Sequence, residues 1–276
     1  MDGLAAELRT FVPRTAGFCF AYWALRQAAY WGSFLVCGRD NTEGGLDVRM
    51  KGLIKAPKRL FLASRFGAFV HAVVSTAVCA RVARAVLPAM RATGRVTRVP
   101  IAYDLPRVPE WDWVLEHSIG YFVNDLLYCA AYEPDPMFVA HHVGYLLGTT
   151  PLRFAERGWM LIVLATVLAE VTNPLQLVWQ SARECGRKGL YERLSLPFTV
   201  SFVAARVVCM TLYIADVGVY VFVDAAGPTR WPMAWTWLAF VFGWAASMLW
   251  TQQLVLGYVK FRSKRSLRAG SSPKAE

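Results

Sequence analysis

The chain has 276 residues, of which 56% are hydrophobic and only 18% are charged, and its formal net charge is +11. Soluble domains are about 45–50% apolar and about 25% charged, so this composition excludes an ordinary soluble enzyme, and the 14% aromatic content excludes a disordered chain. The excess basic residues lie mainly in the connections and the tail, which is typical of membrane proteins and argues against a nucleic-acid partner.

Hydrophobic residues gather in seven segments, most of them long enough to cross the roughly 30 Å hydrocarbon core of a bilayer as helices. The segments are 15–37, 60–88, 114–132, 137–152, 159–181, 197–223 and 233–258. The predicted fold class is therefore all-α. We expect a polytopic transmembrane bundle of seven helices, or of six if the short fourth segment is re-entrant.

The segments divide the chain into three parts. Residues 1–59 hold a first transmembrane helix and a basic cytosolic connection, 60–258 form the main domain, and 259–276 are a basic and then polar tail. With seven spans, a cytosolic C-terminus places 16 Lys and Arg on the cytosolic side and nine on the other, so the positive-inside rule favours this orientation. The short EPDP connection predicts that the third and fourth segments form an antiparallel hairpin.

Three segments carry polar side chains at helical spacing on one face. They are His117, Tyr121, Asp125 and Tyr128 in the third segment, Thr166, Glu170 and Asn173 in the fifth, and Arg206, Cys209, Tyr213 and Asp216 in the sixth. Charges at membrane depth cost at least about 2.5–3.5 kcal/mol on insertion scales. We therefore expect Arg206 to pair with a carboxylate, or some of these charges to line a cavity. Pro174 predicts a kink just after the polar face of the fifth segment.

The fourth segment, FVAHHVGYLLG, contains two adjacent histidines, His141 and His142. Adjacent side chains on a helix point about 100° apart, so both cannot face lipid. A neutral imidazole can act as a general base, a nucleophile or a metal ligand, whereas a purely structural pair would form hydrogen bonds to other helices. The Gly144-xxx-Gly148 spacing predicts close approach of another helix, in the same chain or in a homo-oligomer.

No metal or bound cofactor is expected. The chain has only four histidines and lacks H-x-x-H-H boxes and the H-E-x-x-H motif. Its six cysteines include no C-x-x-C pair, so they predict neither a zinc site nor a disulfide framework.

Three motifs in order resemble the TLC domain: His71 in FGAFVHAVVS, Asp125 in GYFVNDLL, and the histidine pair. The resemblance covers about residues 60–258, and Glu170 with Asn173 in VLAEVTNPLQLVW is similar to the smaller TLC domain-containing proteins. The family includes ceramide synthases and small lipid-homeostasis proteins. The resemblance implies a six-helix bundle around a central lipid cavity, preceded here by one extra helix.

The function implied by the resemblance is lipid homeostasis, carried out by an integral protein of the endoplasmic reticulum or a connected endomembrane. Such a protein would bind or sense a membrane lipid in a polar-lined cavity. The side chains expected to line this cavity are His71, His117, Tyr121, Tyr145, Glu170, Asn173, Arg206 and Tyr213.

Two alternatives stay open. The first is an acyl-CoA-dependent N-acyltransferase of the ceramide synthase type, which would act on a sphingoid base or related amine. His141 or His142 would then be catalytic together with Asp125, and acyl-CoA would be the co-substrate. Ceramide synthases also carry a His-Asp…Asp motif in the next helix, where this chain has Glu170 and Asn173 instead. The second alternative is a non-catalytic trafficking adaptor.

Overall fold

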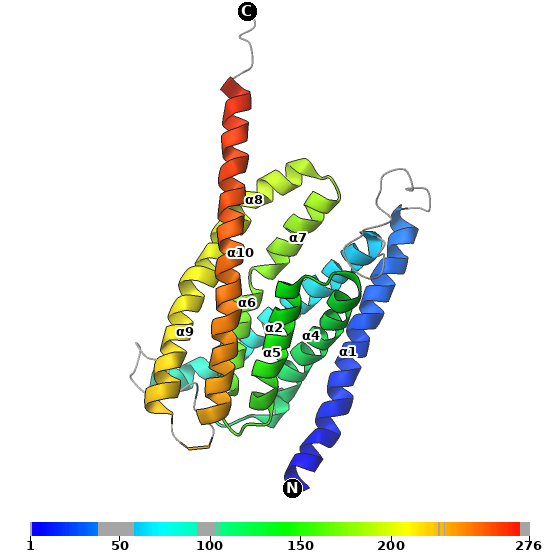
Figure 1. The fold of residues 1–276 in the computed structure, drawn as a ribbon. Coiled ribbons are helices and arrows are strands. Elements are labelled where there is room, and N and C mark those ends of the chain that lie inside the picture. The colour runs from blue at the N-terminus through cyan, green and yellow to red at the C-terminus, as the bar shows by residue number, and fades with distance from the viewer. Residues whose placement is uncertain are drawn as a thin grey trace, which may run out of the picture.

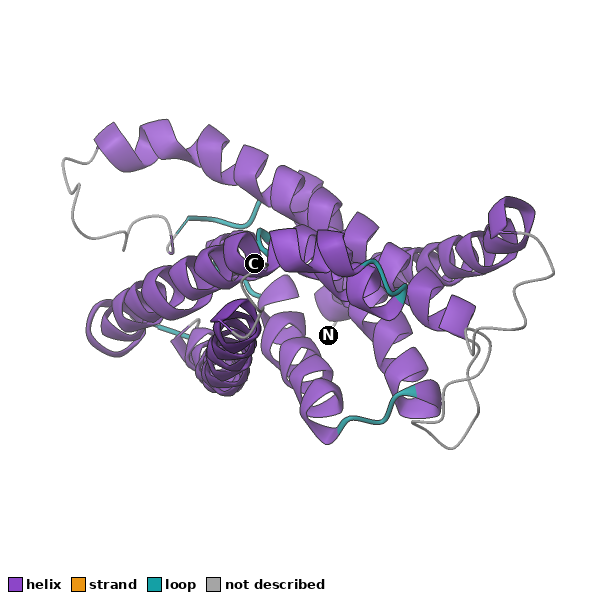
Figure 2. Ribbon diagram, turned by 90° about the horizontal axis from the view of Figure 1, so that it is seen from above, coloured by secondary structure: helices purple, strands orange, loops and turns teal. Residues whose placement is uncertain are grey.

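The computed structural model describes residues 2–37, 58–92, 103, 105–225, 227–228 and 230–270, and every regular element in these ranges is a helix (Figures 1 and 2). The predicted all-α class is confirmed. Most of the basic connection between the first two segments, and much of the loop at 89–113, lies outside the described residues.

The described residues form seven helical columns that run alternately between the two ends of a bundle (Figure 1). The first four columns are α1 (Asp2–Cys37), α2 (Lys58–Ala92), α4 (Asp112–Tyr132), preceded by the short 3-10 turn η2 (Pro109–Trp111), and α5 (Pro136–Arg153). The fifth is α6 (Trp159–Glu170) with α7 (Asn173–Glu184). The sixth is α8 (Lys188–Phe202), η3 (Val203–Cys209), α9 (Met210–Val219) and η4 (Tyr220–Asp224), and the seventh is α10 (Arg230–Gly270).

Among the described residues, four helical stretches are long and apolar enough to cross a membrane: Lys58–Ala85, Trp159–Glu184, Lys188–Asp224 and Arg230–Lys260. The more polar or shorter helices α1, α4 and α5 pack beside them as further columns of the same bundle. Helix α10 continues through Gly270, so the first part of the predicted tail is helical.

The predicted kink in the fifth column is confirmed. Helix α6 ends at Glu170, two residues form a turn, and α7 begins at Asn173 with Pro174 in its first turn. Proline is tolerated there because the first amides of a helix have no intrahelical acceptor. The break leaves Glu170 and Asn173 at the ends of two short helices, near the middle of the column.

The predicted close approach at Gly144 and Gly148 is also confirmed, and the neighbouring helix is α10 of the same chain. A Cβ on Gly148 would lie 2.4 Å from the Cβ of Ala239, and one on Gly144 would lie 3.2 Å from the ring of Phe242. Without those Cβ atoms the two backbones approach closely enough for the hydroxyl of Thr236 to donate to the Gly148 carbonyl at 2.5 Å. Small residues of this kind are how helices pack tightly within a membrane.

At the N-terminal end of the bundle, ionic contacts fix α1 to α4 and α5. Glu7 accepts from Arg107 at 2.8 and 2.9 Å and from Arg153 at 3.0 Å, and Arg153 also donates to Glu116 at 2.6 Å. Glu7 precedes the apolar part of α1, and the hydrogen bonds from Arg107 lower the pKa of its carboxyl from 4.5 to about 2. The extra N-terminal helix is therefore joined to the domain by charge as well as by apolar packing.

Candidate functional site

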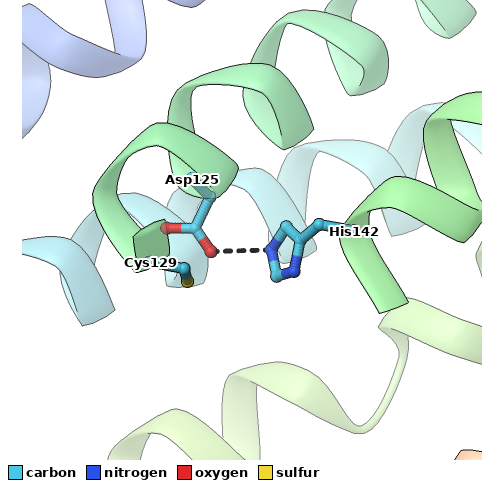
Figure 3. A group of neighbouring side chains, drawn as sticks. All are labelled: Asp125, Cys129 and His142. Atoms are coloured by element: carbon cyan, nitrogen blue, oxygen red, sulfur yellow. Dashed lines mark hydrogen bonds and ion pairs between the residues drawn. The ribbon is translucent and has the colours of Figure 1, made fainter. Parts of the chain in front are cut away.

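A buried carboxylate–imidazole pair joins α4 to α5. The Oδ2 atom of Asp125 lies 3.0 Å from Nε2 of His142, and both residues are less than a tenth exposed. Figure 3 marks this contact by a dashed line. The short EPDP connection makes α4 and α5 an antiparallel hairpin, which brings these two residues level with each other. The other ring nitrogen of His142, Nδ1, lies 2.7 Å from the carbonyl oxygen of Phe138.

These two contacts define where the protons of the pair lie. A carbonyl oxygen only accepts hydrogen bonds, so Nδ1 of His142 must carry a proton. The Nε2 atom then either donates to the Asp125 carboxylate, as part of an imidazolium, or accepts from the protonated carboxyl of Asp125. In both states both ring nitrogens of His142 are engaged, so the ring has no free lone pair for a substrate.

The other oxygen of Asp125 faces α1 and α2. The hydroxyl of Ser64 donates to Oδ1 at 3.4 Å, and the guanidinium of Arg26 lies 3.8 Å from the same oxygen. Arg26 also donates to the side chain of the neighbouring Asn124. The first helix thus supplies a positive charge to the pair formed by α4 and α5.

Cys129 lies one turn after Asp125 on α4, so its thiol is next to the same pair (Figure 3). One ligand atom from each of Asp125, Cys129 and His142 falls within 4.8 Å of the other two, which is close enough to share a metal ion. Structural zinc sites take four ligands, however, and here the carboxylate and imidazole already bind each other beside the positive charge of Arg26. The expectation that no metal is bound stays a prediction.

His141 has different surroundings from its neighbour. Its ring packs edge-on against Phe122 and Trp250, with centroids 6.1 and 5.8 Å away, and no hydrogen bond to it is found among the described residues. His141 lines a cavity, so its ring nitrogens are available to a ligand. The two adjacent histidines therefore differ in hydrogen bonding: both ring nitrogens of His142 are hydrogen-bonded to protein groups, whereas among the described residues His141 makes only ring contacts.

The cavity has a volume of about 160 Å³ and lies between α4, α5, α6, α7, η3 and α10. Its walls combine apolar and aromatic side chains with polar ones from several helices. The predicted site residues that line it are Tyr121, Asp125, His141, His142, Tyr145, Glu170, Asn173 and Arg206. These residues belong to four different columns, and the fold places them around one cavity.

A second and more polar cavity of about 420 Å³ adjoins the first at the α4–α5 turn and the end of α7. Both cavities are lined by Arg65, Asp125, Phe138 and Gln180. Arg65 pairs with Glu133 at 3.2 Å in this outer space. A polar outer space and a more apolar inner one thus meet at Asp125.

The predicted pairing of Arg206 with a carboxylate is indirect. Arg206 donates to the carbonyl of Ala169 and to Oδ1 of Asn173, and the Asn173 amide donates to Glu170 at 2.8 Å. Among the ion pairs of the described residues there is none between Arg206 and Glu170. Because Asn173 begins α7 just after the break, its side chain stands between the two charges and hydrogen-bonds to both.

Three of the residues expected in the cavity wall lie elsewhere. His71 and His117 form a separate buried cluster with Tyr22 of α1, whose hydroxyl lies 2.5 Å from Nε2 of His117. His71 stacks on Tyr121 with centroids 3.8 Å apart, so Tyr121 touches both the cluster and the cavity. Tyr213 instead donates its hydroxyl to the Leu161 carbonyl at 2.5 Å, away from the cavity wall.

Two residues of α1 that bear on the site were not among the predicted site residues. Tyr22 contacts the histidine cluster and Arg26 approaches Asp125. Their spacing of four residues places them on one face of the first helix, and this was the signal available in the sequence.

These features define a polytopic helical membrane protein with a cavity between its helices that is lined by apolar, aromatic and polar side chains. A sequence model of the TLC domain matches residues 61–256, and the chain belongs to this family, whose members are typically membrane proteins linked to lipid metabolism. The chain is also similar to the TLC domain-containing protein At5g14285 of Arabidopsis thaliana, with 29% identity over 56% of this chain and 65% of that protein. No solved structure matches the chain.

Proposed function

We propose that this protein binds a membrane lipid in the cavity between α4, α5, α6, α7, η3 and α10, and that it acts in lipid homeostasis in the endoplasmic reticulum or a connected endomembrane. The observation that carries the proposal is the cavity itself, which is lined by apolar and aromatic side chains and by polar groups from several helices. Pockets of this composition are the usual binding sites for small amphipathic molecules.

The two adjoining cavities suit a molecule with one polar and one apolar part. Phe202, Phe240 and Trp244 offer apolar contacts to a hydrocarbon chain on the inner side. The outer cavity, which meets the inner one at Asp125, offers polar contacts. A lipid chain entering the bundle would thus exchange bilayer contacts for aromatic ones while its polar part finds hydrogen-bond partners.

A second candidate function is acyl transfer from acyl-CoA to an amine, and one observation favours it. The ring of His141 lines the cavity, and no hydrogen bond from the described residues occupies its ring nitrogens, so a lone pair is free for the nucleophile or general base that the reaction needs. In that role a ring nitrogen of His141 would attack the thioester carbonyl and the CoA thiolate would leave; the amine would then attack the acyl-imidazole, which releases His141, and the proton lost by the amine would pass to the CoA thiolate. The Asp125–His142 pair would position the neighbouring helix turn.

The lipid proposal can be tested by filling the cavity from a glycine. Gly243 lines the cavity, and a Cβ there would meet only Nδ1 of His141, at 4.0 Å. Gly243→Leu should therefore project into the space without pushing helices apart. Gly257→Leu on the same helix is the matched control, because nothing lies within 4 Å of a Cβ at Gly257.

Native mass spectrometry of the full chain, purified in mild detergent, is the measurement. Wild type and Gly257→Leu should carry a lipid that Gly243→Leu has lost. An equal lipid load on Gly243→Leu, or none on wild type, would contradict the proposal. A second aliquot, treated with long-chain acyl-CoA and then denatured, tests acyl transfer: a covalent acyl mass that His141→Ala removes would support it. A trafficking adaptor would instead lose function on deletion of its basic tail.

A further inference from the structure

The charged side chains buried in the wall of the inner cavity, together with Arg26 directly behind Asp125, do not cancel. Arg26, Asp125, His142, Glu170 and Arg206 are each exposed by less than a tenth. Charges removed from water in this way are costly unless an opposite charge accompanies them. The net charge of these side chains therefore indicates which charge a ligand of the cavity should carry.

The sum does not depend on where the proton of the histidine pair lies. Imidazolium with carboxylate, and neutral imidazole with protonated carboxyl, both make the Asp125–His142 pair neutral overall. Arg26 and Arg206 each add one positive charge, and Glu170 removes at most one. The buried set thus carries a net charge of at least about +1 within a membrane-spanning bundle.

Neighbouring charges do not change this sum. Arg65, at the edge of the cavity, pairs with Glu133 at 3.2 Å and so adds nothing. Arg26 faces Asp125 and Asn124 and stacks over the ring of Tyr128, with its Cζ 4.5 Å from the ring centroid, and it is not part of the cavity wall.

Arg206 is the positive group that a ligand in the cavity can reach. Its Nη2 atom donates to Ala169 and Asn173, whereas neither its buried Nε nor its Nη1 has a hydrogen-bond partner among the described residues. A guanidinium has five N–H donors, so several remain unused. The side chain is carried by η3, a π-helical turn, and such turns often occur at functional sites.

We propose that the ligand of the inner cavity is a monoanionic lipid, whose negatively charged oxygens bind Arg206 and whose chain lies along the aromatic wall. This inference rests on the proposed function and specifies its ligand. A fatty-acid carboxylate and a phosphodiester headgroup share the required chemistry, since each carries one negative charge and accepts hydrogen bonds from a guanidinium. A lipid amine would add a further positive charge beside Arg206.

The test compares probes that share their hydrocarbon chains and differ in the charge of the polar group. The purified full chain in neutral detergent is titrated with oleate, oleyl alcohol and oleylamine, and separately with dioleoyl phosphatidylglycerol and dioleoylglycerol. Retention is read by native mass spectrometry. We expect the anionic probe of at least one set to bind at least about tenfold more tightly than its neutral partner, as one charge-assisted hydrogen bond would provide. Whether oleate or phosphatidylglycerol shows the preference identifies the source of the anion.

Arg206→Gln should remove this preference, and Arg193→Gln, an exposed arginine of α8, should keep it. The comparison of anionic with neutral probes uses the wild-type chain alone, so it tests the preference for an anion even if Arg206→Gln fails to fold. Equal binding of anionic and neutral probes, or an unchanged preference in folded Arg206→Gln, would overturn the inference while leaving lipid binding intact. If no probe binds and no lipid co-purifies, the proposed function fails as well.

Discussion

Replacing Gly120 by alanine adds one methyl group at a close contact between α4 and α1. An ideal Cβ at this position would lie 2.7 Å from the Cβ of Phe18, 2.8 Å from the carbonyl oxygen of Thr15 and 2.9 Å from the amide nitrogen of Cys19. Two of these are backbone atoms of α1. No side-chain rotation removes the overlap, so α1 has to move away from α4.

The size of the effect follows from these distances. Ordinary contacts with a Cβ begin at 3.4 Å, so α1 must withdraw by about 0.5 to 0.7 Å. Overpacking costs about 1–3 kcal/mol, and we expect about 2–3 kcal/mol here because backbone has to move. The same displacement lengthens the hydrogen bonds that Tyr22 and Arg26 make with His117 and Asn124.

Thermal unfolding of the full chain in detergent is the assay, with Gly257→Ala as control because a Cβ there meets nothing within 4 Å. For a chain of this size the expected cost lowers the melting temperature by about 4–12 °C. The control should melt like the wild type or slightly higher. Equal melting temperatures for Gly120→Ala and Gly257→Ala would refute the close approach of α1 and α4.

Three further predictions concern charges and hydrogen bonds. The hydrogen bonds from Arg107 and Arg153 lower the pKa of Glu7 to about 2, so the stabilisation that Glu7 provides is fully present above pH 4.5 and is lost as the pH falls towards 2. Between pH 5 and 3 the melting temperature of wild type should fall further than that of Glu7→Gln, by a modest amount because the Glu7 side chain is partly exposed. Parallel profiles of melting temperature against pH would contradict this prediction. Asp125→Ala should lower the free energy of unfolding by about 3–5 kcal/mol. In the Asp125→Ala background, His142→Ala should lower it by less than it does in wild type, which a double-mutant cycle in denaturant measures. Strictly additive effects would contradict the pairing of the two residues. Tyr22→Phe should lose about 1 kcal/mol through its bond to His117, and an unchanged unfolding curve would show that this bond contributes nothing.

Much of the fold could be predicted because it depends on local pattern. The lengths of the apolar segments predicted the helices, and Pro174 predicted the break in the fifth column. The spacing of Gly144 and Gly148 predicted a close contact with another helix. Each of these predictions depends only on the residue types within one segment of the chain. The identity of the helix packed on the two glycines needed the structure.

The site was less predictable because partners depend on how helices are rotated against each other. Helical spacing placed Asp125 on a polar face and required at least one of the adjacent histidines to face away from lipid, but only the rotation of α4 against α5 makes Asp125 and His142 a pair. Spacing also could not anticipate Asn173 between Arg206 and Glu170, because that arrangement depends on the helix break and on the π-helical turn η3.

The family match and the folding unit do not have the same limits. The match begins at residue 61, yet Tyr22 and Arg26 of α1 complete hydrogen bonds to residues within it. A fragment trimmed to the matched region would leave His117 without its tyrosine, Asn124 without its arginine, and the face of α4 at Gly120 open to lipid. A fragment of residues 61–256 would therefore lack contacts that the full chain makes. Fragments used for binding studies should include α1.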